Sequence, residues 1–339
     1  MPSYMGVRVS SRWFANSLTT GLSLLVCILL NSCTKPESVS IERLDQALFS
    51  SQSPADVKAF LAKHQQVAQL YFNATDPDSD TALINELTAR VKNPELQVLY
   101  EQTQTEFGDA SRLANELSEA FTNIKRDYPD FKSPRVATFI TGFMGPDLIV
   151  TDSLILIGLD YFAGPTAKYR PRGDEFPQYV LRRYAQPYIV PTIVRLLSDQ
   201  FNQQDRDDQS LLADMVYNGK GLVFTRIMLP EVPDSVIIGY TDRQLTETFN
   251  AQDQVWAHFI DNQLLYQTNP DIKKRYMGER PFTAEIGNRC PGRIGDWLGW
   301  RIASRYYDVQ KSSVPDLMKY ADARRLFQES GYKGQKEDL

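Results

Sequence analysis

The sequence predicts an α+β protein that is predominantly helical, with a small β-sheet in the middle of the chain packed by helices. Three observations support this prediction. Apolar residues recur at helical spacing from residue 41 to about residue 126, short runs rich in β-branched residues follow between residues 135 and 157, and helical spacing returns from residue 177. Because helices and strands occupy separate parts of the chain, the α+β class is favoured over an alternating α/β fold.

The first stretch, residues 41–126, is expected to be helical throughout and has recognisable helix starts. In Ser53-Pro54 and in Asn93-Pro94, a residue that can cap a helix precedes a proline suited to the first helical turn. Later in the stretch, residues 109–125 place Leu113 and Phe121 on one face. We therefore expect an amphipathic helix there.

The middle of the chain predicts strands over residues 135–140, 147–150 and 153–157, with residues 142–146 as a turn. The next segment, residues 158–176, is expected to be a loop rich in aromatic residues. It could present a small ligand, provided that a closed apolar pocket lies beneath it.

The C-terminal half predicts helices over residues 177–185, 191–201, 209–223, 241–262 and 294–307. Two glycine-containing runs, Gly219-Lys220-Gly221 and Gly292-Arg293-Ile294-Gly295, lack the strand–loop–helix context of a phosphate-binding loop. We interpret their glycines as helix-end or turn residues. Trp256, Trp297 and Trp300 fall on these helices, and core packing is their expected role.

The N-terminus is typical of a targeting segment. Arg8 and Arg12 precede an apolar run over residues 22–30, well short of the roughly 20 residues that a membrane-spanning helix needs. Leu30-Asn31-Ser32-Cys33 then resembles a lipobox, in which the cysteine thiol is lipidated and the chain is cut before it. We expect residues 1–32 to be a lipoprotein signal peptide, residues 33–40 a short tether starting at the lipidated Cys33, and residues 41–339 a single domain. The alternative is an ordinary signal peptide or signal anchor in which Cys33 is incidental.

The net charge limits the possible partners, and the cysteine content indicates how the domain is stabilised. Loss of Arg8 and Arg12 with the signal peptide takes the formal net charge from −5 to −7, which disfavours nucleic acid as a partner. Cys27 lies within the segment to be removed, and Cys290 then has no cysteine in the rest of the domain to pair with. The exported domain must therefore be stabilised by its core.

Histidine content argues against a zinc site, and the sequence predicts no metal ligand, no cofactor and no catalytic residue. The only histidines, His64 and His258, are far apart, and neither has a partner at the spacing of H-E-x-x-H, which places both ligands on one helical face. We expect His64 to be exposed, and Asp261 is a possible hydrogen-bond partner of His258. A Ser–His–Asp triad or a Cys290 nucleophile would need one of the same two histidines.

A partial calcium-loop pattern, Asp76-Pro77-Asp78-Ser79-Asp80, also fails as a metal site. Its sixth position is Thr81 where the turn needs glycine, and its twelfth is Leu87 where a bidentate glutamate is needed. We expect an interhelical turn that caps the helix after Asp80, and we interpret residues 205–208 as a solvated loop.

The chain resembles the gliding-motility lipoprotein GldB family of the Bacteroidota over nearly its whole length. Besides the lipobox and the opening segment Ile41–Phe49, the matching segments are Asp152–Phe162, Pro187–Pro191, Asn218–Lys220, Met228–Pro230, Tyr240–Thr241, Val255–Trp256, Leu264–Tyr266 and Pro291–Gly299. The resemblance rests on many short matches without one catalytic signature. It implies a lipoprotein needed for gliding that works with the envelope machinery.

A weaker likeness is to the scaffold of a predicted zinc peptidase family. There, the helix corresponding to Ile193–Phe201 would hold H-E-x-x-H, and a later helix would supply a glutamate. Here the first helix carries Arg195 and Ser198, and the later one has Asn218 before Gly219. The likeness therefore implies at most a degenerate zincin-like scaffold without its metal ligands.

Together these observations predict a non-enzymatic component of the gliding machinery. Its expected partners are the membrane, through the lipid on Cys33, and other gliding or envelope proteins. Its expected location is a cell membrane, inner or outer, on the periplasmic side. The competing hypothesis is a hydrolase or carbohydrate-active enzyme with a carboxylate pair, which would require two acids converging in a cleft.

Overall fold

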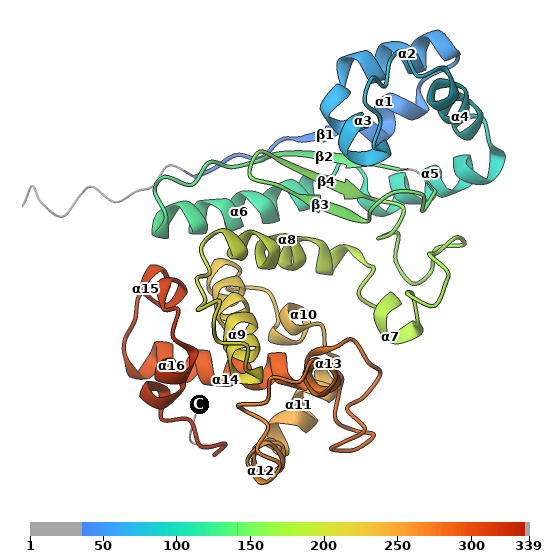
Figure 1. Cartoon of the computed structure of the whole chain (residues 1–339). Coiled ribbons are helices and arrows are strands. Elements are labelled where there is room, and N and C mark those ends of the chain that lie inside the picture. The colour runs from blue at the N-terminus through green and yellow to red at the C-terminus, as the bar shows by residue number, and fades with distance from the viewer. Residues whose placement is uncertain (1–35, 141, 336–339) are drawn as a thin grey trace, which may run out of the picture. The chain divides into compact units, whose positions relative to one another are not determined.

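The computed structural model describes residues 36–140 and 142–335, and it places a four-stranded mixed sheet among helices (Figure 1). The strands lie in the order β1-β2-β4-β3. Their bounds are β1 Ile41–Arg43, β2 Arg135–Phe139, β3 Leu148–Val150 and β4 Leu154–Gly158. β1, β2 and β4 are parallel, and β3 pairs antiparallel with β4. The predicted class, α+β and mostly helical around a small sheet, is confirmed.

The three predicted strands are present to within one or two residues, but the prediction of helix from residue 41 was wrong at its start. Residues 41–43 form β1, whose Ile41 pairs with Val136. A three-residue strand has no periodicity of its own, and its partner lies more than ninety residues further along the chain. Local pattern therefore could not reveal it.

Helices cover both faces of the sheet. On one face, alternate strand residues, among them Ala137, Phe139 and Leu156, join a core with the first helices of the chain. These helices are α1 (Leu44–Phe49), α2 (Pro54–Lys63), α3 (Gln65–Phe72) and α4 (Thr81–Val91). Ser53 caps α2 in a capping box, and Asp80 caps α4 by accepting from Leu83 N at 3.0 Å, as the sequence predicted.

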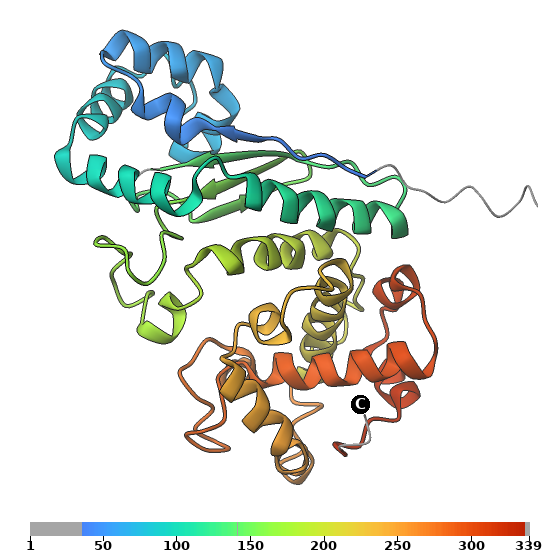
Figure 2. The same ribbon diagram turned by 180° about the vertical axis from the view of Figure 1, so that it is seen from behind.

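The opposite face carries the other alternate residues, including Val136, Ile155 and Ile157, which pack against α6 (Ser111–Asp127) and α8 (Ile189–Leu197). α5 (Pro94–Phe107), which Asn93 caps as predicted, leads from α4 to α6. Figure 2 shows α8 running beneath the sheet, on the side away from α1–α4. The sheet therefore holds α8 against the C-terminal helices.

The first strand and helix are tied to the sheet through Asp45, which is fully buried. Arg43 donates to both of its oxygens, at 3.0 Å and 2.7 Å, and Gln104 and Thr138 donate as well. Burial raises the pKa of Asp45, but these hydrogen bonds and the Arg43 charge outweigh burial, and the pKa is lowered overall. The carboxylate thus joins three distant segments.

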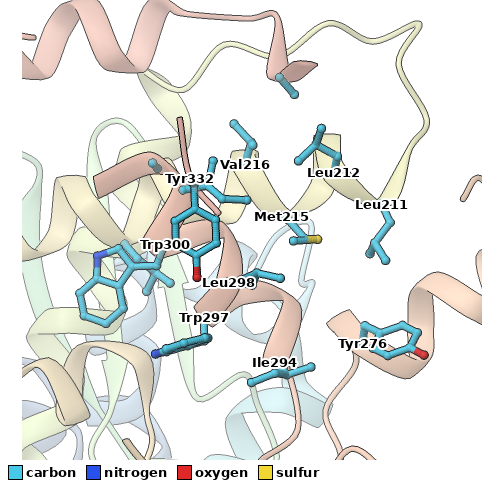
Figure 3. Packing of buried hydrophobic residues seen from close by; sticks show 14 of the residues in the cluster. Leu211, Leu212, Met215, Val216, Tyr276, Ile294, Trp297, Leu298, Trp300 and Tyr332 are labelled. Atoms are coloured by element: carbon cyan, nitrogen blue, oxygen red, sulfur yellow. The ribbon is translucent and has the colours of Figure 1, made fainter. Parts of the chain in front are cut away.

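The C-terminal helices form a second core around two long ones, α9 (Leu211–Met228) and α14 (Ile294–Val309). Figure 3 shows Met215 of α9 and Leu298 and Trp297 of α14 meeting in this core. Trp297 and Trp300 are buried and Trp256 packs at the edge of the core, so their expected role in packing is confirmed. The shorter helices are α10 (Asp234–Ile238), α11 (Asp242–Asn250), α12 (Gln252–Asp261), α13 (Pro270–Met277), α15 (Val314–Lys319) and α16 (Ala323–Ser330).

Four predicted helices differ in extent, and the one predicted over residues 209–223 is α9, which continues to Met228. Residues 177–185 contain only the short α7, Gln178–Leu181, because Ala185 instead forms a bridge with Ala163. The helix predicted over residues 241–262 is split at Ala251 into α11 and α12. The one predicted over residues 191–201 is α8 followed by a short 3₁₀ turn, Ser198–Gln200.

Candidate functional site

A groove of about 450 Å³ lies where β3, α8, α9, α10 and the start of α14 come together. Its lining is mixed. Leu148, Leu196 and Val236 contribute apolar surface, while the charged side chains are Asp147, Arg183, Arg195, Arg293 and Asp296. This volume is in the range of ligand sites, and five charged side chains line the groove, so it is the candidate functional site.

The floor of the groove is a hydrogen-bonded network centred on Arg195 of α8. Arg195 Nη2 donates to Asn218 Oδ1 of α9 at 3.0 Å, and Nη1 donates to Ser198 Oγ at 3.1 Å and Asp199 Oδ1 at 3.2 Å. Gly221 makes room for this guanidinium, because a Cβ there would lie 2.5 Å from Arg195 Cζ. The Arg195 side chain is therefore held in place between α8 and α9.

The network continues to Asp296 in the first turn of α14. Asn218 Nδ2 donates to Asp296 Oδ1 at 2.7 Å, and Arg293 Nη1 lies 3.6 Å from Asp296 Oδ2. Burial raises the pKa of Asp296, with Arg293 and the Asn218 hydrogen bond acting in the opposite direction. Asp296 is thus a buried carboxyl that holds a proton more readily than an exposed one.

Two arginines of the groove lining, Arg183 and Arg293, also belong to a second polar group, in a small pocket beside the groove. Glu279 Oε1 lies 2.8 Å from Arg183 Nη2 and 3.0 Å from Arg293 Nε. Arg182 lies alongside, donating to Gln244 Oε1 at 2.8 Å and to the Gly239 carbonyl, and its buried Nε has no hydrogen-bond partner among the described residues. Sequence reasoning did not identify this group, because its members come from segments about a hundred residues apart.

The chemistry of the floor does not suit a metal ion. α8 is the helix that the peptidase likeness aligns with H-E-x-x-H, and the groove-facing groups here are a guanidinium and an amide, not imidazoles. A guanidinium has no lone pair to offer a cation and repels it. Within residues 36–140 and 142–335, no group of three or more His, Cys, Asp and Glu side chains is placed to hold a metal.

Neither histidine lies in the groove, and the expectation that His64 is exposed was wrong. The His64 side chain is only 9% exposed, because it packs at the junction of α2 and α3 against Phe60. His258 Nε2 lies 3.0 Å from Tyr276 Oη, so Tyr276 takes the place expected for Asp261. Burial lowers the pKa of both imidazoles.

Cys290 is poorly suited to be a nucleophile. It lies outside the groove, and burial raises the pKa of its thiol to about 12. A catalytic cysteine needs the opposite shift, because the thiolate is the reactive form. The thiol is 3.8 Å from the Pro291 carbonyl, which it faces as a weak donor.

The interpretation of Gly219 and Gly221 as helix-end residues was wrong, since both lie inside α9. A Cβ on Gly219 would come within 2.2 Å of the Gly299 backbone, so the glycine allows α9 and α14 to cross closely. Of the second pair, Gly292 precedes α14 and Gly295 lies in its first turn. These glycines therefore allow close packing against other segments of the chain.

The aromatic segment, residues 158–176, packs on itself and on aromatic residues that flank it. Tyr161 contacts Phe143 and Phe176, and Phe176 contacts Tyr184, with ring centroids 5.4 to 6.0 Å apart. Phe162 and Tyr184 border the groove, which charged side chains also line. Binding of a small ligand by this segment stays a prediction.

The expected lipidation site, Cys33, lies outside the described residues. No helix within residues 36–140 and 142–335 has the length and apolar character to cross a membrane. Comparison with curated proteins and with solved structures finds no match. The family model for gliding motility protein GldB matches residues 31–334, which is nearly the whole chain. The chain belongs to the GldB family of gliding motility proteins.

Proposed function

We propose that this protein is a lipoprotein, anchored to the periplasmic side of a membrane through Cys33, that acts in gliding as a non-enzymatic binding component. Family membership supports a role in gliding, and the lipobox supports the anchor. The observation that carries the non-enzymatic part is the Arg195–Asn218–Asp296 network.

The network supports binding over hydrolysis for an electrostatic reason. A hydrolytic metal site needs neutral or anionic ligands around an open position, as in three-ligand zinc sites. In this groove the corresponding helix supplies the fixed positive charge of Arg195, held by Asn218 and Asp199. The groove therefore has side chains that are suited to holding a polar partner.

Replacement of Cys33 by serine tests the anchor. We expect the protein to lack both its acyl chains and the cut before residue 33, and gliding on agar to be lost, because the lipid is added to a thiol and the cut requires the lipidated cysteine. The mass of the purified protein and colony spreading are the measurements. Cys290→Ser is the matched control and should change neither the processing at residue 33 nor gliding. Normal gliding by a deletion strain would contradict a role in motility.

A carboxylate-based hydrolase is the competing function, and one observation favours it: Asp147 and Asp296 line the same groove. Both carboxylates are already engaged, however. Asp147 Oδ2 accepts from Tyr184 Oη at 2.7 Å, and Asp296 is held by Asn218 and Arg293. A general acid and base would need at least one of them released.

The isosteric variants Asp147→Asn and Asp296→Asn separate the two functions. Under the proposed function, each variant should keep at least about half of the gliding speed, because an amide oxygen still accepts the Tyr184 or Asn218 hydrogen bond. Loss of an acid or base in a hydrolase typically costs about 10²- to 10⁴-fold in rate. Gliding speed is compared at equal protein level by immunoblot. Abolished gliding in both variants at normal abundance would favour the enzyme.

A further inference from the structure

Beside the groove, two of its lining arginines form a clamp that is filled by the protein's own carboxylate. The Arg183 and Arg293 side chains are 22% and 19% exposed and converge on one oxygen of Glu279. Arg182 adds a third guanidinium, and its pKa is lowered first by burial and then by the nearby charges of Arg183 and Arg293. Positive charge is therefore concentrated here, on a chain whose net charge is negative.

Glu279 itself is the least constrained member of this group. Its side chain is 46% exposed, about twice as exposed as either arginine, and it lies between α13 and α14 in a segment without regular structure. Ion pairs that are this exposed contribute little net stability, because water competes for both partners. A carboxylate from another molecule could take the place of Glu279 at small cost.

The groove beyond the clamp offers features that a polypeptide can use. Leu196 of α8 is 43% exposed, and the neighbouring Leu148 belongs to β3, the edge strand of the sheet. Asp147 O and Thr151 N bond to β4, so the alternation of the strand directs the backbone groups of Leu148 and Val150 to the open side. Such an edge can pair with an extended segment.

We propose that this groove binds an extended acidic segment of a partner polypeptide, with a partner carboxylate replacing Glu279 between Arg183 and Arg293. The arginines are complementary in charge to an acidic side chain of the partner. The open edge of β3 can pair with an extended backbone, and Leu196 can contact apolar side chains next to the acidic one. The inference rests on the proposed function in one respect, namely that the protein works by binding other proteins.

The test measures binding of a labelled peptide to the full-length protein in detergent. A fluorescein-labelled peptide of alternating Glu and Val is titrated by fluorescence anisotropy, with a Lys–Val peptide of equal length as the reference. We expect only the acidic peptide to bind, and binding to weaken with added salt. Glu279→Gln should tighten binding about tenfold by removing the internal competitor, and Arg183→Gln should weaken it at least about tenfold.

Arg90 and Glu86 on α4 provide a matched control pair. They form an ion pair of similar exposure, 20% and 56%, on the opposite side of the sheet from α8. Glu86→Gln changes the net charge as Glu279→Gln does and should leave affinity unchanged, as should Arg90→Gln. Equal tightening by Glu86→Gln and Glu279→Gln, or no change with Glu279→Gln, would overturn the proposal.

Two further readouts separate the ligand class and the proposed function. Succinate should displace the peptide only at concentrations far above that of the peptide. Displacement at an equal concentration would show that the ligand is a small dicarboxylate and not a polypeptide. Mass spectrometry of the peptide after incubation should find it intact. A cleaved peptide would contradict the non-enzymatic function and leave the binding site standing.

Discussion

Gly299→Ala is expected to destabilise the protein by at least about 3 kcal/mol. A Cβ on Gly299 would lie 1.8 Å from Met215 O and 2.4 Å from Met215 C. Both atoms belong to the backbone of α9, so no side-chain rotation can relieve the clash. α9 and α14 would have to separate, and the core between them would lose its packing.

The measurement is urea unfolding followed by tryptophan fluorescence, since Trp297 and Trp300 lie in this core. Gly331→Ala is the control. Its φ is +62° and a Cβ there meets nothing within 4 Å, so alanine should cost only the left-handed backbone preference, about 1–2 kcal/mol. A Gly299→Ala variant no less stable than Gly331→Ala would show that the helices do not cross as closely as described.

Lys220→Met is expected to have the second large effect, one that depends on pH. Lys220 is 1% exposed, and its Nζ donates to the carbonyls of Gln203 at 2.6 Å, Tyr320 at 2.8 Å and Met318 at 3.3 Å. Methionine fills similar space but leaves these carbonyls without that donor. At pH 9.5 we expect a loss of about 3 kcal/mol in the free energy of unfolding.

The pH dependence follows from the pKa of the ammonium group. Burial lowers the pKa of Lys220 to about 7, so between pH 7 and 10.5 the unfolded chain binds more protons than the folded one. The stability of the native protein relative to Lys220→Met therefore rises with pH across this window. From pH 9.5 to pH 7 the difference in the free energy of unfolding between the native protein and Lys220→Met should shrink by up to about 3 kcal/mol. The hydrogen bonds that the charged ammonium donates to the three carbonyls make this change smaller.

Urea unfolding of both proteins at the two pH values checks this result. The control is Lys319→Met, whose side chain is exposed on α15 and should change stability by less than about 0.5 kcal/mol at either pH. A penalty for Lys220→Met that is equal or larger at pH 7 would contradict the pKa shift.

Local patterns predicted those parts of the fold that depend on neighbouring residues. Ser53, Asn93 and Asp80 cap helices because a cap acts within one turn. The three strands between residues 135 and 158 were visible because each is short and rich in β-branched residues. β1 and the interior glycines of α9 were not visible, since β1 and Gly219 depend on segments eighty or more residues away and Gly221 on Arg195 of α8.

The candidate site shows the same limit. The likeness to the predicted zinc peptidase family pointed to α8 and Asn218. Comparing these positions with the family's motif showed that the sequence lacks the peptidase ligands there. The Arg183–Glu279–Arg293 clamp gave no sequence signal, because arginines and glutamates are common on any solvated surface. These three side chains meet only because the segment between α13 and α14 folds back against the residues that follow α7.

The buried ammonium of Lys220 also has a consequence for the order in which the chain can fold. Its acceptors at residues 318 and 320 lie near the end of the described chain, β1 must wait for residues 136–138, and α9 must wait for α14. These long sequence separations make early folding during synthesis unfavourable. We therefore expect the native core to form only after the last segments of the chain have been made.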